Sequence, residues 1–157
     1  MSQFNWNHRF IRLAGHIAEW SKDPSTKCGA VIIRPDKTIA SMGFNGLPQG
    51  IEDNPEVLMN REAKLERVIH AEMNALLFLR ERAEGYTMYV WPSLPCNRCA
   101  AHIIQSGIKK VYFPDIPMLH WTTAMGISRQ LFAEAEVEME CIFIGTEPTR
   151  DTQPVLL

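Results

Sequence analysis

Four residues in two short stretches of the sequence have side chains that can act together in chemistry. His70 and Glu72 lie in "RVIHAEMNALL", and Cys96 and Cys99 lie in "WPSLPCNRCA", 26 residues further along. Two cysteines at this spacing occur in redox disulfides, in structural zinc sites and in catalytic zinc sites. The cysteine pair alone does not decide between these three kinds of site.

His70, considered together with Cys96 and Cys99, favours an open zinc site. One imidazole and two thiolates provide three ligands for a tetrahedral Zn²⁺ and leave the fourth position for water, as in catalytic sites. Both stretches are expected to begin helices, whose positive ends favour thiolates over thiols. Glu72 is then placed to take a proton from the water, which zinc acidifies to a pKa near ~7. A core histidine with two buried cysteines, or a redox pair, remains the alternative.

The composition indicates one ordinary globular domain. The chain has 157 residues, 46% hydrophobic and 22% charged, with a net charge of −2. A small negative charge argues against a protein that coats DNA or RNA. No signal peptide and no apolar run of ~20 residues is visible, so we expect a cytoplasmic protein with reduced cysteines. We expect a single domain over 1–157, with a loosely ordered tail at about 147–157.

Hydrophobic periodicity and turn residues predict alternating helices and strands. Helices are expected over 5–21, 70–85, 96–107 and 122–136, the second ended by Gly85 and the third by Gly107. Strands are expected over 28–33, 38–44, 87–92, 108–114 and 137–145. The first two strands read as a hairpin, and 47–69 reads as a long excursion with a short helix in its second half. This order predicts an α/β domain with a mixed sheet.

Four blocks of the sequence resemble a known family. They are "SKDPSTKCGAVI", "GFNGLPQG", "HAEMNAL" and "TMYVWPSLPCNRCAAHIIQSGIKKVYF". Between about residues 5 and 114 the chain resembles the deoxycytidylate (dCMP) deaminase branch of the cytidine-deaminase-like zinc deaminases, which carry the H-x-E and P-C-x-x-C signature. The resemblance implies a three-layer α/β/α fold with about five strands in a mixed central sheet flanked by helices. It also implies zinc-dependent hydrolysis of dCMP to dUMP and ammonia.

The resemblance assigns roles to the four residues above. It implies His70, Cys96 and Cys99 as zinc ligands and Glu72 as the proton shuttle. Some relatives hold a further structural zinc in the long insertion with cysteines and histidines. Residues 47–69 contain neither, so we expect one catalytic Zn²⁺ per chain. Cys28, where relatives usually have valine, is expected to be a small buried hydrophobic residue.

The resemblance also implies the residues around the substrate. Asn45 in "GFNG" is expected to contact the sugar or base, because its amide both donates and accepts hydrogen bonds; a simple N-G turn is the alternative. The other expected contacts are Gly43, Gly46, Ala71, His120 and Trp121. Trp121 and His120 can enclose a pyrimidine by stacking, although a core tryptophan and a surface histidine fit equally well.

A phosphate on the substrate requires a basic side chain near the site. The candidates are Lys22, Lys27, Arg61 and Lys64, of which the last two also fit a solvated helix face. The resemblance implies that Phe44, Asn45 and Gly46 form an allosteric loop that binds a regulatory dCTP or dTTP. Mg²⁺ bound together with this nucleotide is a second candidate cofactor. The resemblance further implies a homo-oligomer, such as a hexamer.

The segment "PDIPMLHWTTAMG" after residue 113 departs from the family pattern, which leaves the substrate open. The rival function is deamination of another small amino-heterocycle, such as a nucleoside or guanine. A third alternative is a non-catalytic nucleotide-binding regulatory module, which would need the zinc but not Glu72. Neither a polynucleotide nor a membrane is expected as a partner, since no basic track with interleaved aromatic residues is evident.

Overall fold

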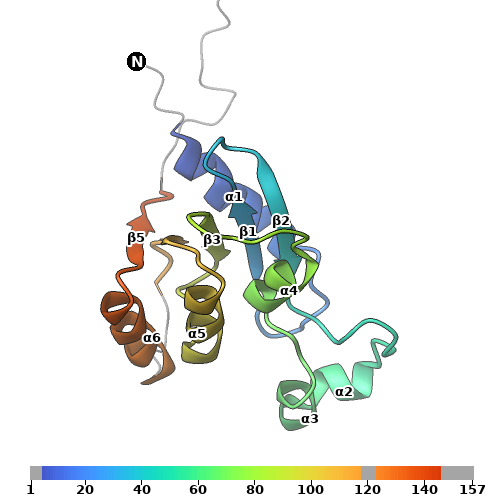
Figure 1. Cartoon of the computed structure of the whole chain (residues 1–157). Coiled ribbons are helices and arrows are strands. Elements are labelled where there is room, and N and C mark those ends of the chain that lie inside the picture. Colours follow the sequence, from blue (N-terminus) through green and yellow to red (C-terminus); the bar gives the residue numbers. More distant parts are fainter. Residues whose placement is uncertain (1–4, 118–122, 146–157) are drawn as a thin grey trace, which may run out of the picture.

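A computed structural model describes residues 5–117 and 123–145, which form a five-stranded mixed sheet covered by helices on both faces (Figure 1). The strands lie in the order β2-β1-β3-β4-β5. Their bounds are β1 Gly29–Ile33, β2 Ile39–Phe44, β3 Thr87–Trp91, β4 Lys110–Pro114 and β5 Glu138–Ile142. β1 pairs antiparallel with β2 and β3, whereas β3, β4 and β5 run parallel to one another. The predicted hairpin and mixed sheet are confirmed.

The helices complete three layers. Their bounds are α1 Trp6–Ala18, α2 Pro55–Met59, α3 Arg61–Leu65, α4 Ala71–Phe78, α5 Asn97–Gln105 and α6 Thr123–Glu134. α1 covers one face of the sheet, and α4, α5 and α6 cover the other. The three-layer fold expected from the family resemblance is therefore confirmed. None of the helices in the described ranges is long and apolar enough to cross a membrane.

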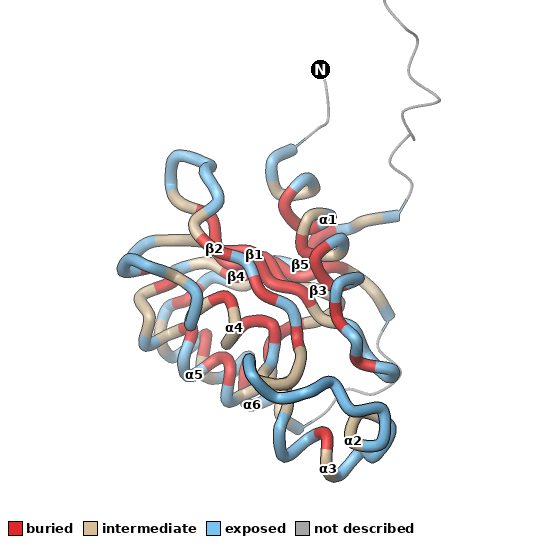
Figure 2. The backbone as a smooth tube through the Cα atoms, turned by 90° about the vertical axis from the view of Figure 1, so that its right-hand side faces the viewer, coloured by how far each residue is buried: buried red, intermediate tan, exposed pale blue. Residues whose placement is uncertain are grey.

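The strand pattern explains the two hydrophobic cores. In β1 every residue is buried, because successive side chains point to opposite faces and both faces are covered. Val31 and Ile33 pack with α1, and Ala30 and Ile32 pack with the helices on the other side. Figure 2 shows the central strands β1, β3 and β4 as mostly buried, while the excursion that carries α2 and α3 is largely exposed.

Two elements differ from the sequence prediction. α4 ends at Phe78, seven residues before Gly85, because Leu79 is extended and the following segment makes other backbone bonds, including Gly85 N–H to Gly107 O at 2.9 Å. The excursion holds two short helices instead of one. The predicted tail over 147–157 lies outside the described residues.

Candidate active site

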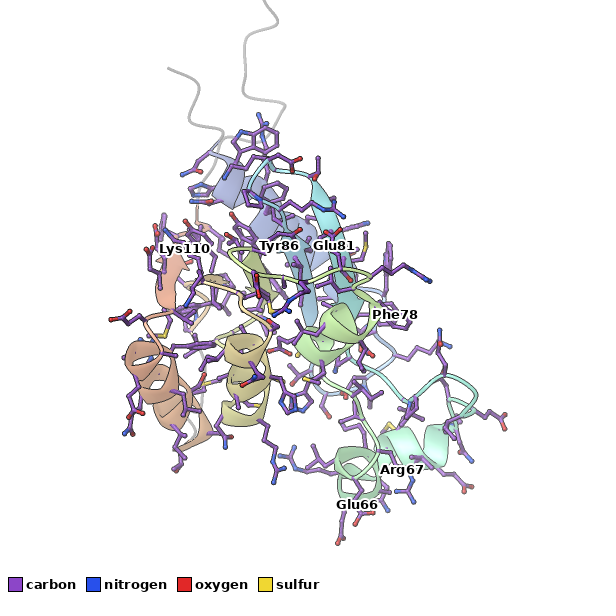
Figure 3. All side chains as sticks on the ribbon, in the orientation of Figure 1. Glu66, Arg67, Phe78, Glu81, Tyr86 and Lys110 are labelled. Atoms are coloured by element: carbon purple, nitrogen blue, oxygen red, sulfur yellow. The ribbon has the colours of Figure 1, made fainter. Side chains whose placement is uncertain are left out.

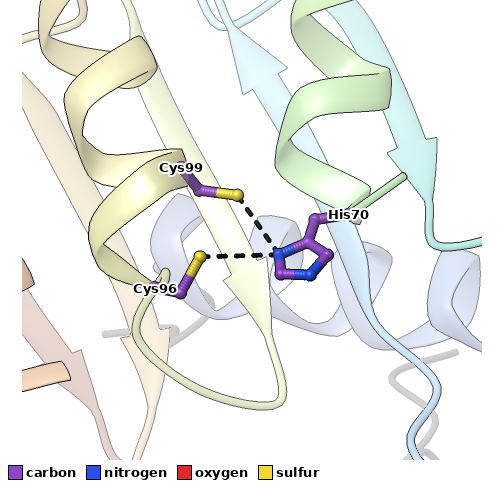
Figure 4. A group of neighbouring side chains, drawn as sticks. All are labelled: His70, Cys96 and Cys99. Atoms are coloured by element: carbon purple, nitrogen blue, oxygen red, sulfur yellow. Dashed lines mark hydrogen bonds between the residues drawn. The ribbon is translucent and has the colours of Figure 1, made fainter. Parts of the chain in front are cut away.

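Three side chains from two helix starts converge on one point (Figure 4). His70 Nδ1 lies 3.5 Å from Cys96 Sγ and 3.4 Å from Cys99 Sγ. The three donor atoms lie within 4.8 Å of one another. They are the only group of at least three His, Cys, Asp or Glu residues in the described ranges that could hold a metal ion.

At both helix starts the N-cap side chain belongs to this cluster and does not cap its own helix. His70 is the N-cap of α4 and Cys96 is the N-cap of α5, and neither makes a side-chain capping hydrogen bond. Ser, Thr, Asp and Asn are the residues that normally cap helices. Pro95 precedes the N-cap, so it lies just outside the helix. The two caps face the site instead of their own helices.

The donor set fits a tetrahedral Zn²⁺. With Zn–S near ~2.3 Å and Zn–N near ~2.0 Å, ligand atoms around tetrahedral zinc lie roughly 3.5 Å apart. The distances from His70 Nδ1 to the two sulfur atoms, 3.4 and 3.5 Å, agree with this. Nitrogen and thiolate donors also suit zinc better than Mg²⁺ or Ca²⁺. Zn²⁺ would therefore be held through Nδ1 of His70 and the sulfur atoms of Cys96 and Cys99.

The protons of this cluster are unevenly distributed. Hydrogen bonds from Cys99 and then His70 lower the pKa of Cys96 to about 3. The hydrogen bond with Cys96, followed by burial, raises the pKa of Cys99. The hydrogen bond to Cys96 also raises the pKa of His70. The site therefore favours a thiolate at Cys96 before any metal binds.

Glu72 is a buried carboxyl group beside these ligands. It lies in the first turn of α4, two residues after His70, and is 8% exposed. Burial raises its pKa above the ordinary value of 4.5, because a low-dielectric setting disfavours the charged form. A carboxyl group with a raised pKa can both accept and return a proton near neutral pH.

A cavity of about 270 Å³ joins these residues to the excursion. His70, Glu72 and Cys96 are among the residues that line it. The other lining residues are Asp23, Ser25, Thr26, Cys28, Asn45, Arg61, Lys64, Leu65, Val68, Ser93, Leu94 and Met125. The walls thus come from the loop before β1, the end of β2, the excursion, the start of α5 and α6. Such a concave site with a few polar groups is typical of small-molecule binding.

Asn45 lines this cavity, but its amide is largely used within the protein. Its Oδ1 accepts from the backbone N–H of Cys28 at 2.8 Å, and its Nδ2 donates to the carbonyl of Thr26 at 2.9 Å. Ser21 Oγ donates to the Asn45 carbonyl at 2.8 Å. Asn45 therefore holds the loop before β1 in place. One amide proton and one lone pair remain for a ligand.

Gly43, Gly46 and Ala71, which were also expected around the substrate, do not line this cavity. A Cβ at Gly43 would collide with the backbone of Ala71 and Ala75, so this glycine lets β2 approach α4 and not a ligand. Gly46 pairs with Ile69 through two backbone hydrogen bonds, of 3.1 and 2.8 Å. Ala71 is fully buried. His120 and Trp121 lie outside the described residues.

The four basic candidates differ in their partners. Lys64 lines the cavity but donates to Asp23 Oδ1 at 3.0 Å and to Ser25 Oγ at 3.2 Å. Lys22 is paired with Asp53 at 2.6 Å and does not line the cavity. Lys27 lines a different cavity, beside Trp91 on the α1 side of the sheet.

Arg61 differs from the three lysines. It is exposed, lines the active-site cavity and has no hydrogen-bonding or ion-pair partner among the residues that the structure describes. Its guanidinium group is thus available to bind an anion.

Several lining residues were missed by the sequence reasoning. Ser25, Thr26 and Cys28 belong to the block "SKDPSTKCGAVI", whose resemblance to the family was a signal that this loop borders the site. Cys28 is half-buried at the cavity wall, and burial raises the pKa of its thiol to about 12. Leu94 and Met125 carried no signal, since apolar residues at these positions look like ordinary core.

The buried pair of Lys64 and Asp23 ties the excursion to the body of the domain. The two side chains are only 5% and 7% exposed. Lys64→Met should destabilise the protein by about 3 kcal/mol at pH 7, because it leaves a buried carboxylate without its counter-charge. Urea unfolding measures this. Lys22→Met breaks the exposed pair with Asp53 and, as the control, should cost less than about 1 kcal/mol.

The effect of Lys64→Met should also depend on pH. Burial alone would raise the pKa of Asp23, but hydrogen bonds from the Ser25 N–H, Lys64 and the Thr26 N–H lower it below 3.8. The stability that the carboxylate contributes is therefore present above pH 3.8 and is lost as the pH falls through the lower folded pKa. The gap between wild type and variant should narrow in acid, and a constant gap would contradict the assigned ion pair.

The chain is similar to known deaminases over most of its length. A sequence model described as "cytidine and deoxycytidylate deaminase zinc-binding region" matches residues 4–114. An uncharacterised deaminase from the luxG 3′ region of Aliivibrio fischeri is 42% identical over 137 residues, which cover 85% of this chain and 91% of that protein. The deoxycytidylate deaminase of Mus musculus is 39% identical over 114 residues. That match covers 69% of this chain and only 64% of the mouse enzyme.

The fold is similar to a solved structure as well. The dCMP deaminase of cyanophage S-TIM5, in complex with dCMP and dUMP, superposes with a TM-score of 0.70. The two chains are 25% identical, and the match covers 90% of this chain and all of the phage protein.

Proposed function

The chain belongs to the cytidine and deoxycytidylate deaminase family with its zinc-binding region, and from this premise we propose that it hydrolyses dCMP to dUMP and ammonia. The observation that carries the proposal is the convergence of His70, Cys96 and Cys99 beside the buried carboxyl group of Glu72. A non-catalytic module would need the three ligands but would have no use for a carboxyl group with a raised pKa.

The proposed chemistry adds water at C4 of the cytosine ring and expels the amino group as ammonia. When bound, Zn²⁺ supplies a Lewis acid that makes water a nucleophile at neutral pH. His70, Cys96 and Cys99 hold the metal. Glu72 takes a proton from the attacking water and gives it to ring N3, and it then takes the proton of the new C4 hydroxyl group and passes it to the leaving amine. Its burial excludes bulk water from these transfers.

The cavity supports a substrate with a 5′-phosphate. Glu72 from α4 and Arg61 from the excursion both line it, so the base and the phosphate can contact different walls. Ser25 and Thr26 line the same cavity and offer hydroxyl donors. Because Lys64 is neutralised by Asp23, we assign phosphate recognition chiefly to Arg61.

A substrate panel tests the proposal. Zinc-loaded protein is incubated with dCMP, CMP, dCTP, deoxycytidine, cytosine and guanine, and ammonia release is measured. The highest kcat/KM is expected for dCMP. A preference for a nucleoside or a free base would replace this proposal by the rival deaminase, and no turnover with any of the six would contradict both.

Arg61→Ala should lower kcat/KM for dCMP by about 10- to 100-fold, because a hydrogen bond to a charged group contributes roughly 1.5–3 kcal/mol. Turnover of deoxycytidine, which has no phosphate, should stay as in wild type. Arg67→Ala is the matched control, since Arg67 is exposed on the same excursion but does not line the cavity. An equal loss for dCMP and deoxycytidine would show that Arg61 does not read the phosphate.

Five further expectations stay as parts of the proposal. We expect one deaminase domain over 1–157 and a cytoplasmic enzyme without a polynucleotide partner. We expect a homo-oligomer, with a hexamer as the form that the family resemblance implies. Regulation by dCTP or dTTP through Phe44, Asn45 and Gly46, with Mg²⁺ bound to the nucleotide, is tested by adding these nucleotides to the substrate panel.

A further inference from the structure

A second cavity shares a wall with the active-site cavity. It has a volume of about 300 Å³. Among the described residues three line both cavities, namely Ser93, Leu94 and Met125, which we call the partition. The rest of the second cavity is lined by residues of β4 and the segment after it, of α6 and of β5. Because each residue of the partition borders both spaces, the partition separates the two cavities.

The partition stands directly beside the metal ligands. Leu94 precedes Cys96 by two residues and is 3% exposed. Met125 lies in the first turn of α6, which packs beside α5 on the same face of the sheet (Figure 1), and it is 8% exposed. A methionine side chain is long, unbranched and adaptable in shape. Truncation of Met125 would therefore open a passage between the two cavities.

The proposed function, on which this inference rests, sets the orientation of the cytosine ring. C4 must lie at the metal, and its two neighbours in the ring are N3 and C5. Glu72 on α4 delivers a proton to N3, so N3 faces α4. The metal ligands lie between the starts of α4 and α5 (Figure 4). C5 therefore points away from α4, toward the start of α5 and toward α6, where the partition lies.

We propose that Met125 is a specificity-determining residue that limits the size of the substituent on C5 of the cytosine ring. The buried side chains of Leu94 and Met125 close the site at this position. A hydrogen atom on C5 fits against them, whereas a long substituent collides with Met125. In an apolar pocket a single methylene group already changes discrimination by about 10- to 200-fold. The partition thus selects cytosine nucleotides with a small group at C5.

Replacing Met125 by alanine should admit a C5 substituent to the second cavity. We measure kcat/KM of wild type and of Met125→Ala for dCMP and for 5-propynyl-dCMP. The ratio of the value for 5-propynyl-dCMP to the value for dCMP should rise by at least about 10-fold in the variant. The electronic effect of the propynyl group is the same in both proteins, so it cancels in this comparison. Met125→Leu nearly conserves the volume of the side chain and should retain the wild-type ratio.

Leu65→Ala is the matched control, because it shortens another apolar side chain of the active-site cavity. Leu65 ends α3 and is not among the described residues that line the second cavity. Figure 3 labels Glu66 and Arg67, the two residues after Leu65, on the far side of α5 from α6. Leu65→Ala can change both values of kcat/KM, but their ratio should stay as in wild type.

The outcomes separate this inference from the proposed function. An unchanged ratio in Met125→Ala, or an equal rise in Leu65→Ala, would overturn the role of Met125. A wild type that hydrolyses 5-propynyl-dCMP as efficiently as dCMP would overturn it as well. Circular dichroism checks folding, and Met125→Val, which removes less volume, replaces Met125→Ala if that variant does not fold. A wild type that does not hydrolyse dCMP would instead contradict the proposed function.

Discussion

Glu72→Gln is expected to reduce kcat for dCMP by about 10²- to 10⁴-fold, the range that general acid–base catalysis contributes, while the protein keeps its zinc. Glutamine has nearly the same shape as glutamate but cannot accept a proton. His70, Cys96 and Cys99 are unchanged, so the metal ligands remain complete. Steady-state ammonia release and metal content, measured on the same preparation, separate the two roles.

The control for this change is Glu84→Gln, the same substitution at a carboxyl group that is 66% exposed and does not line the cavity. It should leave both kcat and zinc content as in wild type. If Glu72→Gln retained a tenth or more of the wild-type turnover, Glu72 would not be the proton shuttle. If the variant lost its zinc, the carboxyl group would be needed for binding the metal.

The order and type of most elements could be predicted because their periodicity is local. The hairpin of β1 and β2 and the helix–strand alternation after it follow from hydrophobic spacing and turn residues. The end of α4 could not be predicted in this way. Residues after Phe78 remain compatible with a helix, but Glu81 pairs with Arg34 at 2.5 Å and Ala83 is buried in the core. These contacts between distant parts of the chain override local propensity.

The three candidate metal ligands were the part of the site most visible in the sequence, because metal binding restricts residue type and spacing together. The role of Asn45 was less visible. Its amide bonds the backbone of Thr26 and Cys28, which lie 19 and 17 residues away. Gly43 was expected to contact a ligand, but in the structure it packs against the backbone of α4. The same residue types serve both purposes, so only the tertiary structure distinguishes them.

The basic residues also show that the role of a residue type depends on its tertiary contacts, here on its counter-charge. A lysine in the sequence is a candidate for phosphate binding until its counter-charge is known. Lys64 and Asp23 are 41 residues apart in the chain and form a buried pair. Lys22 and Asp53 are 31 residues apart and form an exposed one. Arg61 is distinguished only by the lack of such a partner among the described residues.

The excursion between β2 and α4 contributes to both ends of the site. Arg61 and Lys64 belong to α3 within it, and its last residue, Ile69, leads directly to His70. The ion pair of Lys64 with Asp23 holds α3 against the body of the domain. The backbone pairing of Ile69 with Gly46 holds the end of the excursion. A disturbance of the excursion should therefore affect phosphate recognition and metal binding together.

Cys99→Ala is expected to remove the metal and the activity together. Cys99 is buried in the first turn of α5, and its sulfur lies 3.4 Å from His70 Nδ1. Loss of a residue that merely supports a ligand weakens metal binding by about 10- to 100-fold, so loss of the ligand itself should exceed this. Metal binding stabilises only the folded state. A chelator should therefore lower the melting temperature of wild type but not that of Cys99→Ala.

Two cysteine variants serve as controls for this prediction. Cys141→Ala changes an exposed thiol on β5 and should bind one zinc per chain with wild-type turnover. Cys28→Ala changes a thiol that lines the cavity without belonging to the ligand group, and it should also retain the zinc. If Cys28→Ala lost the metal while Cys99→Ala kept it, the ligand set would have to be reassigned. If all three variants retained zinc and its stabilisation, the metal would not be held by Cys99.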